Sequence, residues 1–151
     1  MRQRGFEVVR AYQGQGIHLP ERKTACSAGY DIEAAVNVKM PPHQVTLIPT
    51  GIKAYMQPDE YLGIHVRSGF SIRQQVSCVN GQGIIDADYY NNEDNEGHIM
   101  VALINHSDVE VEVSKGMRVA QGIFYQYRTV DDDAAGMGEK RRGGMGSTGA
   151  K

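Results

Sequence analysis

The chain has 151 residues, of which 40% are hydrophobic and 23% charged, and this ordinary globular composition fits a single folded domain and argues against disorder. Its formal net charge of -2 argues against a protein that holds nucleic acid mainly through phosphate contacts, because such proteins are usually basic. No apolar run is long enough to cross a membrane, and the first ten residues lack the apolar region of a signal peptide, so we expect a cytoplasmic protein with no membrane partner. Two cysteines cannot form a disulfide framework, so we expect the protein to be reduced.

Short apolar or alternating runs, separated by turn residues, extend to about residue 130, and helical periodicity is almost absent. In the most regular run, Val109, Val111 and Val113 alternate with two glutamates, as in a strand with one buried face. The pattern predicts about ten strands in an all-β antiparallel sandwich, jelly roll or small barrel. The predicted strands lie at 36–40, 45–48, 52–56, 61–66, 76–79, 99–104, 109–113 and 117–127, with others starting near residue 30 and ending near residue 86.

Two segments depart from the strand pattern. Residues 89–97 are polar and acidic, and we expect them to form an exposed excursion between strands. Residues 131–151 are rich in glycine and almost without large apolar side chains, so they cannot bury enough surface to fold alone. The sequence therefore predicts a β domain at 1–130 and a mobile C-terminal tail at 131–151.

The first two candidate segments place polar groups at strand ends. Asp31 follows a step of small residues at the start of a strand. Arg67, Ser68 and Gly69 end the strand predicted at 61–66, where a guanidinium, a hydroxyl and open amides suit a phosphate group. An arginine beside a turn is, however, more often simply solvated.

The third candidate segment is the hairpin that begins at Asn80. Asn80 and Gly81 form a strong hairpin signal, and we expect Ile84 and Ile85 to enter the core and deliver Asp86 at the end of the strand. A carboxylate in that place can act as a general base when a water molecule is within reach. The alternative is a hairpin followed by solvated acidic residues.

The fourth segment places Arg118 and Gln121 in an otherwise apolar strand. Such groups require partners, so they are either structural partners or ligand contacts. In the fifth segment, 143–149, glycine amides and two hydroxyls follow three basic residues, an inventory that suits a polyphosphate. It is not a Walker A loop, because Ala150 stands where the lysine is needed. The alternative is a tail without a role.

Taken in order, the segments at 28–32, 67–69, 80–89, 116–121 and 142–149 resemble the five motifs of the trimeric deoxyuridine triphosphate nucleotidohydrolases, the dUTPases. The resemblance extends from about residue 20 to the end of the chain. It implies a jelly-roll-like distorted β-barrel and a homotrimer with three shared active sites. One subunit supplies the first, second and fourth motifs, its neighbour the third, and the remaining subunit its tail.

The resemblance also implies a reaction, the hydrolysis of dUTP to dUMP and pyrophosphate, which keeps uracil out of DNA and supplies dUMP for thymidylate synthesis. Asp86 would activate a water for in-line attack on the α-phosphate, Asp31 would hold the water molecules coordinated to Mg²⁺, and Gln121 would contact the phosphates. The implied substrate-binding residues are Arg67, Ser68, Gly69, Asn80, Gly83, Ile85, Tyr89, Arg142, Met145, Gly146, Ser147 and Thr148.

The resemblance also implies that the third motif determines which nucleotide is bound. Asn80 and the hairpin backbone around Gly83 would pair with the edge of uracil and leave no room for a 5-methyl group. Tyr89 would pack on the deoxyribose and reject a 2′-hydroxyl, and the tail would close over the nucleotide as a lid.

The sequence departs from the usual motifs at four places. Val66 replaces a common proline, residues 90–96 lengthen the stretch after the third motif, and Met145 replaces a phenylalanine that stacks on uracil. The arginine of the tail is assigned to Arg142 rather than to one of the two basic residues before it.

Two other functions are compatible with the predicted fold. A dCTP deaminase shares it together with part of the third motif, but needs an acid or base, usually a glutamate, beside the pyrimidine C4. The other is a regulatory or structural jelly-roll protein that keeps the nucleotide pocket as a switch and binds a protein partner through 90–96. Ammonia release from dCTP would identify the first, and a partner lost on shortening 90–96 the second.

Overall fold

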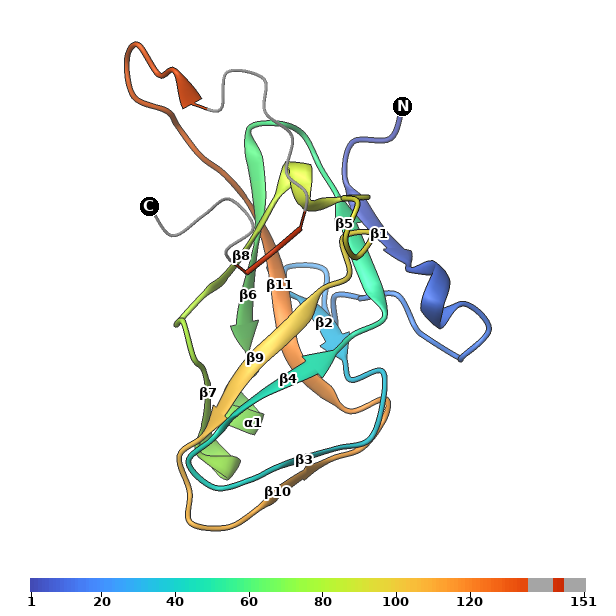
Figure 1. The fold of residues 1–151 in the computed structure, drawn as a ribbon, viewed down its shortest axis with the longest axis vertical. Helices are drawn as coiled ribbons and strands as arrows, with labels where there is room; N and C mark the ends of the chain where they lie inside the picture. The colour runs from blue at the N-terminus through green and yellow to red at the C-terminus, as the bar shows by residue number, and fades with distance from the viewer. Residues whose placement is uncertain (136–142, 146–151) are drawn as a thin grey trace.

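The computed structural model describes residues 1–135 and 143–145, which contain eleven strands, one α-helix and two short 3₁₀ turns (Figure 1). In chain order these elements are β1 (Gly5–Val8), η1 (Arg10–Tyr12), β2 (Tyr30–Glu33), β3 (Val38–Met40), β4 (Val45–Pro49), β5 (Ile52–Tyr55), β6 (Glu60–Val66), α1 (Ser68–Gln74), β7 (Val76–Cys78), β8 (Gly83–Asp86), η2 (Ala87–Tyr89), β9 (Met100–Asn105), β10 (Val111–Val113) and β11 (Arg118–Gln126). The all-β prediction is confirmed.

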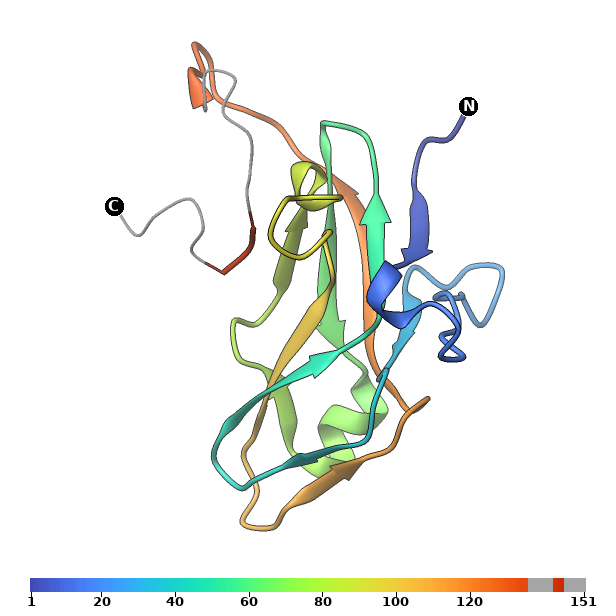
Figure 2. The same cartoon turned by 45° about the vertical axis from the view of Figure 1, so that its right-hand side comes forward.

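The strands pair in antiparallel fashion and form four sheets. The largest has the order β2-β11-β6-β8, a second has the order β4-β9-β7, and β1-β5 and β3-β10 are two-stranded. Figures 1 and 2 show β4 and β9 crossing over β6 and β11, while β3 and β10 close one end. This is the jelly-roll-like arrangement of sheets around one core that the sequence predicts.

The core lies between the two larger sheets and is built by alternation along the strands. On β9, Val101 and Leu103 are buried while Met100, Ala102 and Ile104, which alternate with them, are only half-buried, and Leu62 of β6 belongs to the same apolar cluster. Each large aliphatic side chain buried in this way contributes about 1.5–3 kcal/mol. β10 follows its predicted alternation but begins two residues late, at Val111, because the backbone of the exposed Val109 is hydrogen-bonded to the side chains of Asn105 and Ser107 in the preceding turn.

The sequence pattern predicts neither α1 nor β1. The seven residues of α1 bury only Phe70, whereas Ile72 is 78% exposed, so the helix has no apolar stripe that a periodicity search could detect. β1 lies on one side of the molecule, where it pairs with β5. In the part of the chain that the structure describes, no helix is long and apolar enough to span a membrane.

The prediction that residues 89–97 form an exposed excursion is wrong in part. Tyr89 and Asn92 are buried, and the nearly buried Lys53 of β5 donates to Asn91 Oδ1 and to Glu96 Oε2, both at 2.6 Å. Polar residues are packed here through hydrogen bonds and an ion pair rather than through apolar burial. Composition alone therefore gives too exposed a prediction.

Charge pairing ties the same loop to the N-terminal strands. The Lys53 ammonium lowers the pKa of Glu96 below its ordinary value because it donates a hydrogen bond to that carboxylate. The Tyr90 hydroxyl donates to Glu7 of β1 at 2.5 Å, and this bond lowers the pKa of Glu7. Burial, together with the same bond, raises the pKa of Tyr90. The loop is thus anchored on β1 and β5.

Candidate active site

One cavity, of about 380 Å³, lies beside the hairpin between β7 and β8. Its wall includes most of the residues that the third motif predicted, together with two residues of the tail, Gly144 and Met145. The predicted site residues among them are Asn80, Gly83, Ile85, Asp86, Tyr89 and Met145. The structure therefore brings the predicted base-reading residues and one of the predicted catalytic residues, Asp86, to one place.

The hairpin that borders this cavity is a very tight turn. Gly81 N donates to Cys78 O at 3.0 Å, and Gln82 N donates to Asn80 O at 2.8 Å. Gly81 has a φ of 75°, a left-handed conformation that glycine adopts without strain. The tight turn predicted at Asn80 and Gly81 is confirmed, but the prediction of a β-hairpin is wrong, because β7 pairs with β9 and β8 with β6 rather than with each other. Below, the word hairpin denotes this turn and the start of β8.

β8 leaves the hairpin and pairs with β6. A Cβ on Gly83 would lie 3.2 Å from the Cβ of Ile64, so the missing side chain lets the two strands approach closely. The prediction that both isoleucines enter the core is wrong for Ile84, which is 59% exposed on the cavity wall. Successive side chains of a strand face opposite sides, so only Ile85 packs against the core.

Tyr89 is held in one orientation by its hydroxyl. It donates to the His98 carbonyl at 2.7 Å and accepts from Asn95 Nδ2 at 2.8 Å. The His98 ring is fixed in turn, because its Nε2 accepts from Gly51 N at 2.9 Å, and burial lowers the pKa of His98. The aromatic ring of Tyr89 is thus a rigid part of the cavity wall.

Two further groups in this cavity differ in what they can do. Asp86 is the last residue of β8 and lies opposite Tyr61 of β6. Cys78 is buried, and burial raises the pKa of its thiol. The raised pKa favours the protonated thiol, which cannot accept a proton, whereas the carboxylate of an ionised aspartate can.

A second cavity, of about 350 Å³, lies at the end of β6 where α1 begins. It brings together the predicted residues of the first, second and fourth motifs with others that the sequence reasoning did not single out. The lining residues are Lys23, Ser27, Ala28, Gly29, Asp31, Arg67, Ser68 and Gln121. Gly69 is the second residue of α1 and does not line either cavity.

The pairing of β2 with β11 places Asp31 opposite Gln121. A Cβ on Gly29 would overlap the Gln121 side-chain oxygen, so the glycine leaves the space that this amide occupies. Lys23 and Ser27 stand in an irregular stretch before β2, where no pattern of the sequence marks them as site residues. Their basic and hydroxyl groups add to the groups in this cavity that suit an anion.

Asp31 lies between two guanidinium groups. Its Oδ1 is 3.2 Å from Arg67 Nε and its Oδ2 is 3.5 Å from Arg118 Nη1. Arg118, which the sequence left open between structural partner and ligand contact, is therefore an ion-pair partner of Asp31. Among the described residues, the buried Oδ2 of Asp31 has no hydrogen-bond partner. A buried carboxylate oxygen of this kind calls for a further ligand such as water or a cation.

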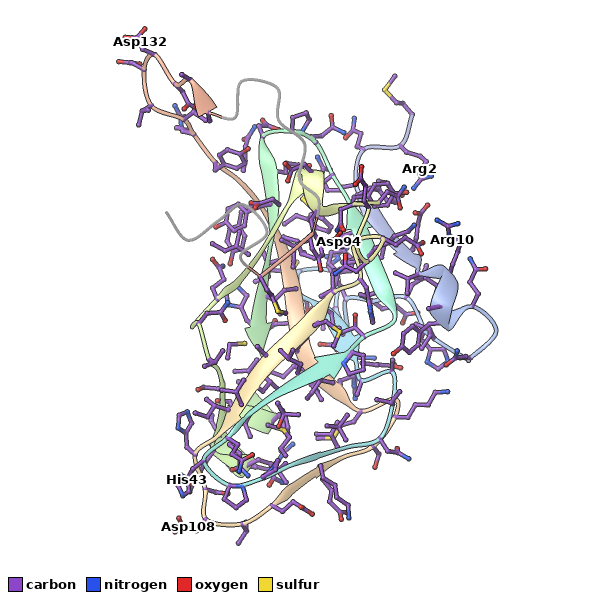
Figure 3. All side chains as sticks on the ribbon, viewed as in Figure 1. Arg2, Arg10, His43, Asp94, Asp108 and Asp132 are labelled. Carbon is purple, nitrogen blue, oxygen red and sulfur yellow. The ribbon has the colours of Figure 1, made fainter. Side chains whose placement is uncertain are left out.

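Residues 143–145 of the tail lie against the third-motif cavity of their own chain. A Cβ on Gly144 would lie 2.8 Å from Tyr89 Cε1, and one on Gly143 would overlap the carboxylate of Asp94, which Figure 3 shows in the upper half of the molecule. Met145 lines the cavity but is 73% exposed. Arg142, Gly146, Ser147 and Thr148 lie outside the described residues.

Among the described residues the two cavities have no lining residue in common. One contains the hairpin and Asp86, and the other contains Asp31, Arg67 and Gln121. A single chain thus contains one mainly hydrophobic cavity with a few polar groups and a separate cavity with several charged groups.

Comparison with known proteins gives a consistent result. The family model described as dUTPase matches residues 15–149. The deoxyuridine 5′-triphosphate nucleotidohydrolase of Lactococcus lactis is 49% identical over 150 residues, which cover 99% of this chain and 100% of that protein. The protein of the same name from Bartonella henselae is 34% identical, over 95% of this chain and 83% of its own length. The crystal structure of dUTPase from Streptococcus mutans superposes with a TM-score of 0.80 at 40% identity, covering 84% of this chain and 98% of that one.

Proposed function

The chain belongs to the dUTPase family and is a dUTP diphosphatase, and from this premise we propose that its two cavities are the nucleoside and phosphate halves of a site completed between copies of the chain. The observation that carries the proposal is the division of the motif residues between two cavities that share no described lining residue. A nucleoside triphosphate needs both halves at once, and a closed ring of copies can bring the hairpin of one to the charged cavity of the next.

In the nucleoside half, the uracil edge would pair with Asn80 and with the hairpin backbone from Gly83 to Ile85. The narrow turn, fixed by the positive φ of Gly81, supports the rejection of a 5-methyl group because its backbone has little freedom to withdraw. The rigidly held ring of Tyr89 would pack on the deoxyribose and exclude a 2′-hydroxyl.

In the phosphate half, Arg67 and Ser68 would bind phosphate oxygens together with the amide of Gly69 and the side chain of Gln121. Arg67 stands at the N-terminal end of α1, and its guanidinium offers charge-assisted hydrogen bonds. The tail of a copy would close over the nucleotide and place Met145 on the base. The other contacts of the tail would come from Arg142, Gly146, Ser147 and Thr148.

Asp31 fits a role at a magnesium ion. Its buried Oδ2, which accepts no hydrogen bond among the described residues and lies 3.5 Å from Arg118 Nη1, would accept hydrogen bonds from water molecules on the cation, while Oδ1 stays paired with Arg67. Within the described residues no group of three acidic, histidine or cysteine side chains could hold a metal alone, so the substrate phosphates would supply the other ligands. Bound Mg²⁺ would neutralise the triphosphate charge and favour pyrophosphate as the leaving group.

Asp86 would act as the general base. Its carboxylate would take a proton from a water molecule as the water oxygen attacks the α-phosphorus in line with the bond to the bridging oxygen. That bond breaks, pyrophosphate leaves with its electron pair, and dUMP remains. The position of Asp86 at the cavity wall, at the end of β8, supports this role.

The test is pyrophosphate release from dUTP, UTP, dTTP and dCTP in the presence of Mg²⁺, with the oligomeric state measured by light scattering. We expect rapid release from dUTP alone, loss of turnover when EDTA removes the metal, and a mass of three chains. Ammonia release from dCTP would instead identify a deaminase. A monomer that hydrolyses dUTP at full rate would contradict the shared site.

A further inference from the structure

The hairpin that borders the nucleoside cavity must keep a fixed position relative to the sheet if its backbone is to form hydrogen bonds with a base. Its own hydrogen bonds, Gly81 N to Cys78 O and Gln82 N to Asn80 O, close the turn but do not connect its tip to the strands beneath. The tip itself is open, since a Cβ on Gly81 would meet nothing within 4 Å. The backbone on either side is tied to β9 by Val79 N to Ala102 O and to β6 by the pairing of Gly83 with Ile64, so a further anchor would act on the three residues of the tip, 80–82.

Gln82 supplies a connection of this kind. Its side-chain Nε2 donates to Nε2 of His65 on β6 at 3.1 Å, so that His65 nitrogen acts as an acceptor. The same nitrogen lies 3.0 Å from the hydroxyl of Tyr125 on β11. One amide thus links the hairpin to two neighbouring strands of the main sheet, in a partly buried cluster.

The sheet leaves a space in which this amide lies. Gly63 of β6 pairs with Ile84 of β8 on one side and with Ile123 of β11 on the other. A Cβ on Gly63 would overlap the Gln82 amide and would lie 2.6 Å from Tyr125 Cε2. The missing side chain at position 63 is therefore what lets Gln82 reach across β6.

The far end of the cluster is rigid. The ring of Tyr125 stacks on Tyr61, with centroids 5.0 Å apart and an angle of 12° between the planes. Tyr61 and Tyr125 are opposite one another in the β6–β11 register, so both rings belong to the middle of a sheet. A hydrogen bond from Gln82 into this cluster fixes the hairpin against a part of the fold that has little freedom to move.

We propose that Gln82 is a positioning residue for base recognition. By hydrogen bonding to the His65–Tyr125 pair through the space at Gly63, it holds the hairpin backbone in the position from which that backbone pairs with uracil. This inference rests on the proposed role of the hairpin in binding the base. Gln82 touches neither the phosphates nor the reacting water in this account. Its loss therefore changes KM and base discrimination and leaves kcat in place.

The main test replaces Gln82 by methionine, which keeps the length of the side chain and removes the amide oxygen and nitrogen. Gln82→Met should raise KM for dUTP about 2- to 10-fold, the factor that one or two partly buried hydrogen bonds supply, with kcat within about twofold of wild type. The preference for dUTP over dCTP should fall by a similar factor. Gln44→Met, a change of the same kind at an exposed glutamine on the loop before β4, is the matched control and should change neither quantity.

A second variant approaches the cluster from its other end. Tyr125→Phe removes only the hydroxyl and should raise KM in the same direction. In the double variant the two effects should not multiply, because both changes break one chain of contacts. Fully multiplicative effects would show that the two side chains act separately and would overturn the proposal.

The outcomes also separate this inference from the proposed function. If the wild-type chain releases no pyrophosphate from dUTP, the proposed function fails and the inference with it. If the wild type is active and Gln82→Met keeps both the wild-type KM and the wild-type preference for dUTP over dCTP, only the positioning role of Gln82 is wrong. A loss of kcat at unchanged KM would equally overturn it, by assigning Gln82 to the chemical step.

Discussion

Two substitutions at Tyr89 separate the work of its ring from that of its hydroxyl. Tyr89→Phe removes the bonds to the His98 carbonyl and to Asn95 Nδ2, at 2.7 and 2.8 Å. The exposed Asn95 amide can turn to water, whereas the His98 carbonyl is only partly accessible, so we expect a loss of about 1–3 kcal/mol in the free energy of unfolding. The ring stays in the cavity wall, so the preference for dUTP over UTP should persist.

Tyr89→Ala removes the ring as well and leaves a void among the residues that it contacts. Tyr89 is 8% exposed, and truncating a buried aromatic side chain costs about 3–5 kcal/mol. Without the ring, the 2′-hydroxyl of UTP meets no obstacle, and the preference for dUTP should fall strongly.

The assay compares kcat/KM for dUTP and UTP in both variants, with urea unfolding at one fixed protein concentration because assembly affects stability. If Tyr89→Phe relaxes the preference as much as Tyr89→Ala does, the hydroxyl rather than the ring rejects ribose. If Tyr89→Ala keeps the full preference, another group excludes the 2′-hydroxyl and this reasoning is refuted.

Three further changes test other parts of the account. Asp86→Asn should lower kcat by a factor of about 10²–10⁴, the usual contribution of a general base, while dUTP still binds in calorimetry; wild-type turnover in this variant would remove Asp86 from the role of base. Gly29→Ala should displace the Gln121 amide and reduce kcat/KM about 10- to 100-fold at a nearly unchanged melting temperature, and full activity would show that Gln121 is not needed in its present place. Burial lowers the pKa of His98 in the folded chain below its ordinary 6.5. As the pH falls below 6.5, the unfolded chain therefore takes up a proton before the folded chain does, and the free energy of unfolding decreases. His98→Gln, which can still accept from Gly51 N, should therefore show a flatter decline of the urea midpoint between about pH 7 and pH 5; a decline as steep as that of the wild type would contradict the assignment.

Strands with one clearly buried face could be predicted from the sequence. β10 follows the alternation of valine and glutamate, and β9 a continuous apolar run. The helix α1 could not be predicted, because Phe70 alone anchors it in the core. The folding of residues 89–97 could not be predicted either, since Lys53, which neutralises Glu96 in the loop, lies on a distant strand.

The sequence predicts which residues belong to the candidate site better than it predicts which of them lie together. Asp31, Arg67 and Gln121 stand in three separate segments, and only the pairing of β2 and β6 with β11 brings them into one cavity. The ion pair of Asp31 with Arg118 depends on that same pairing. The separation of this cavity from that of Asp86 is a property of the folded chain which no local pattern indicates.

Subunit complementation tests the shared site most directly. The variants Asp86→Asn and Arg67→Ala each damage one half of the site, so each should be nearly inactive alone. When the two are co-expressed in equal amounts, random mixing in a trimer should pair two intact halves at about a quarter of the sites, and dUTP turnover should return to about a quarter of the wild-type rate. Mixed trimers that remain as inactive as their parents would show that both halves of the working site come from one chain.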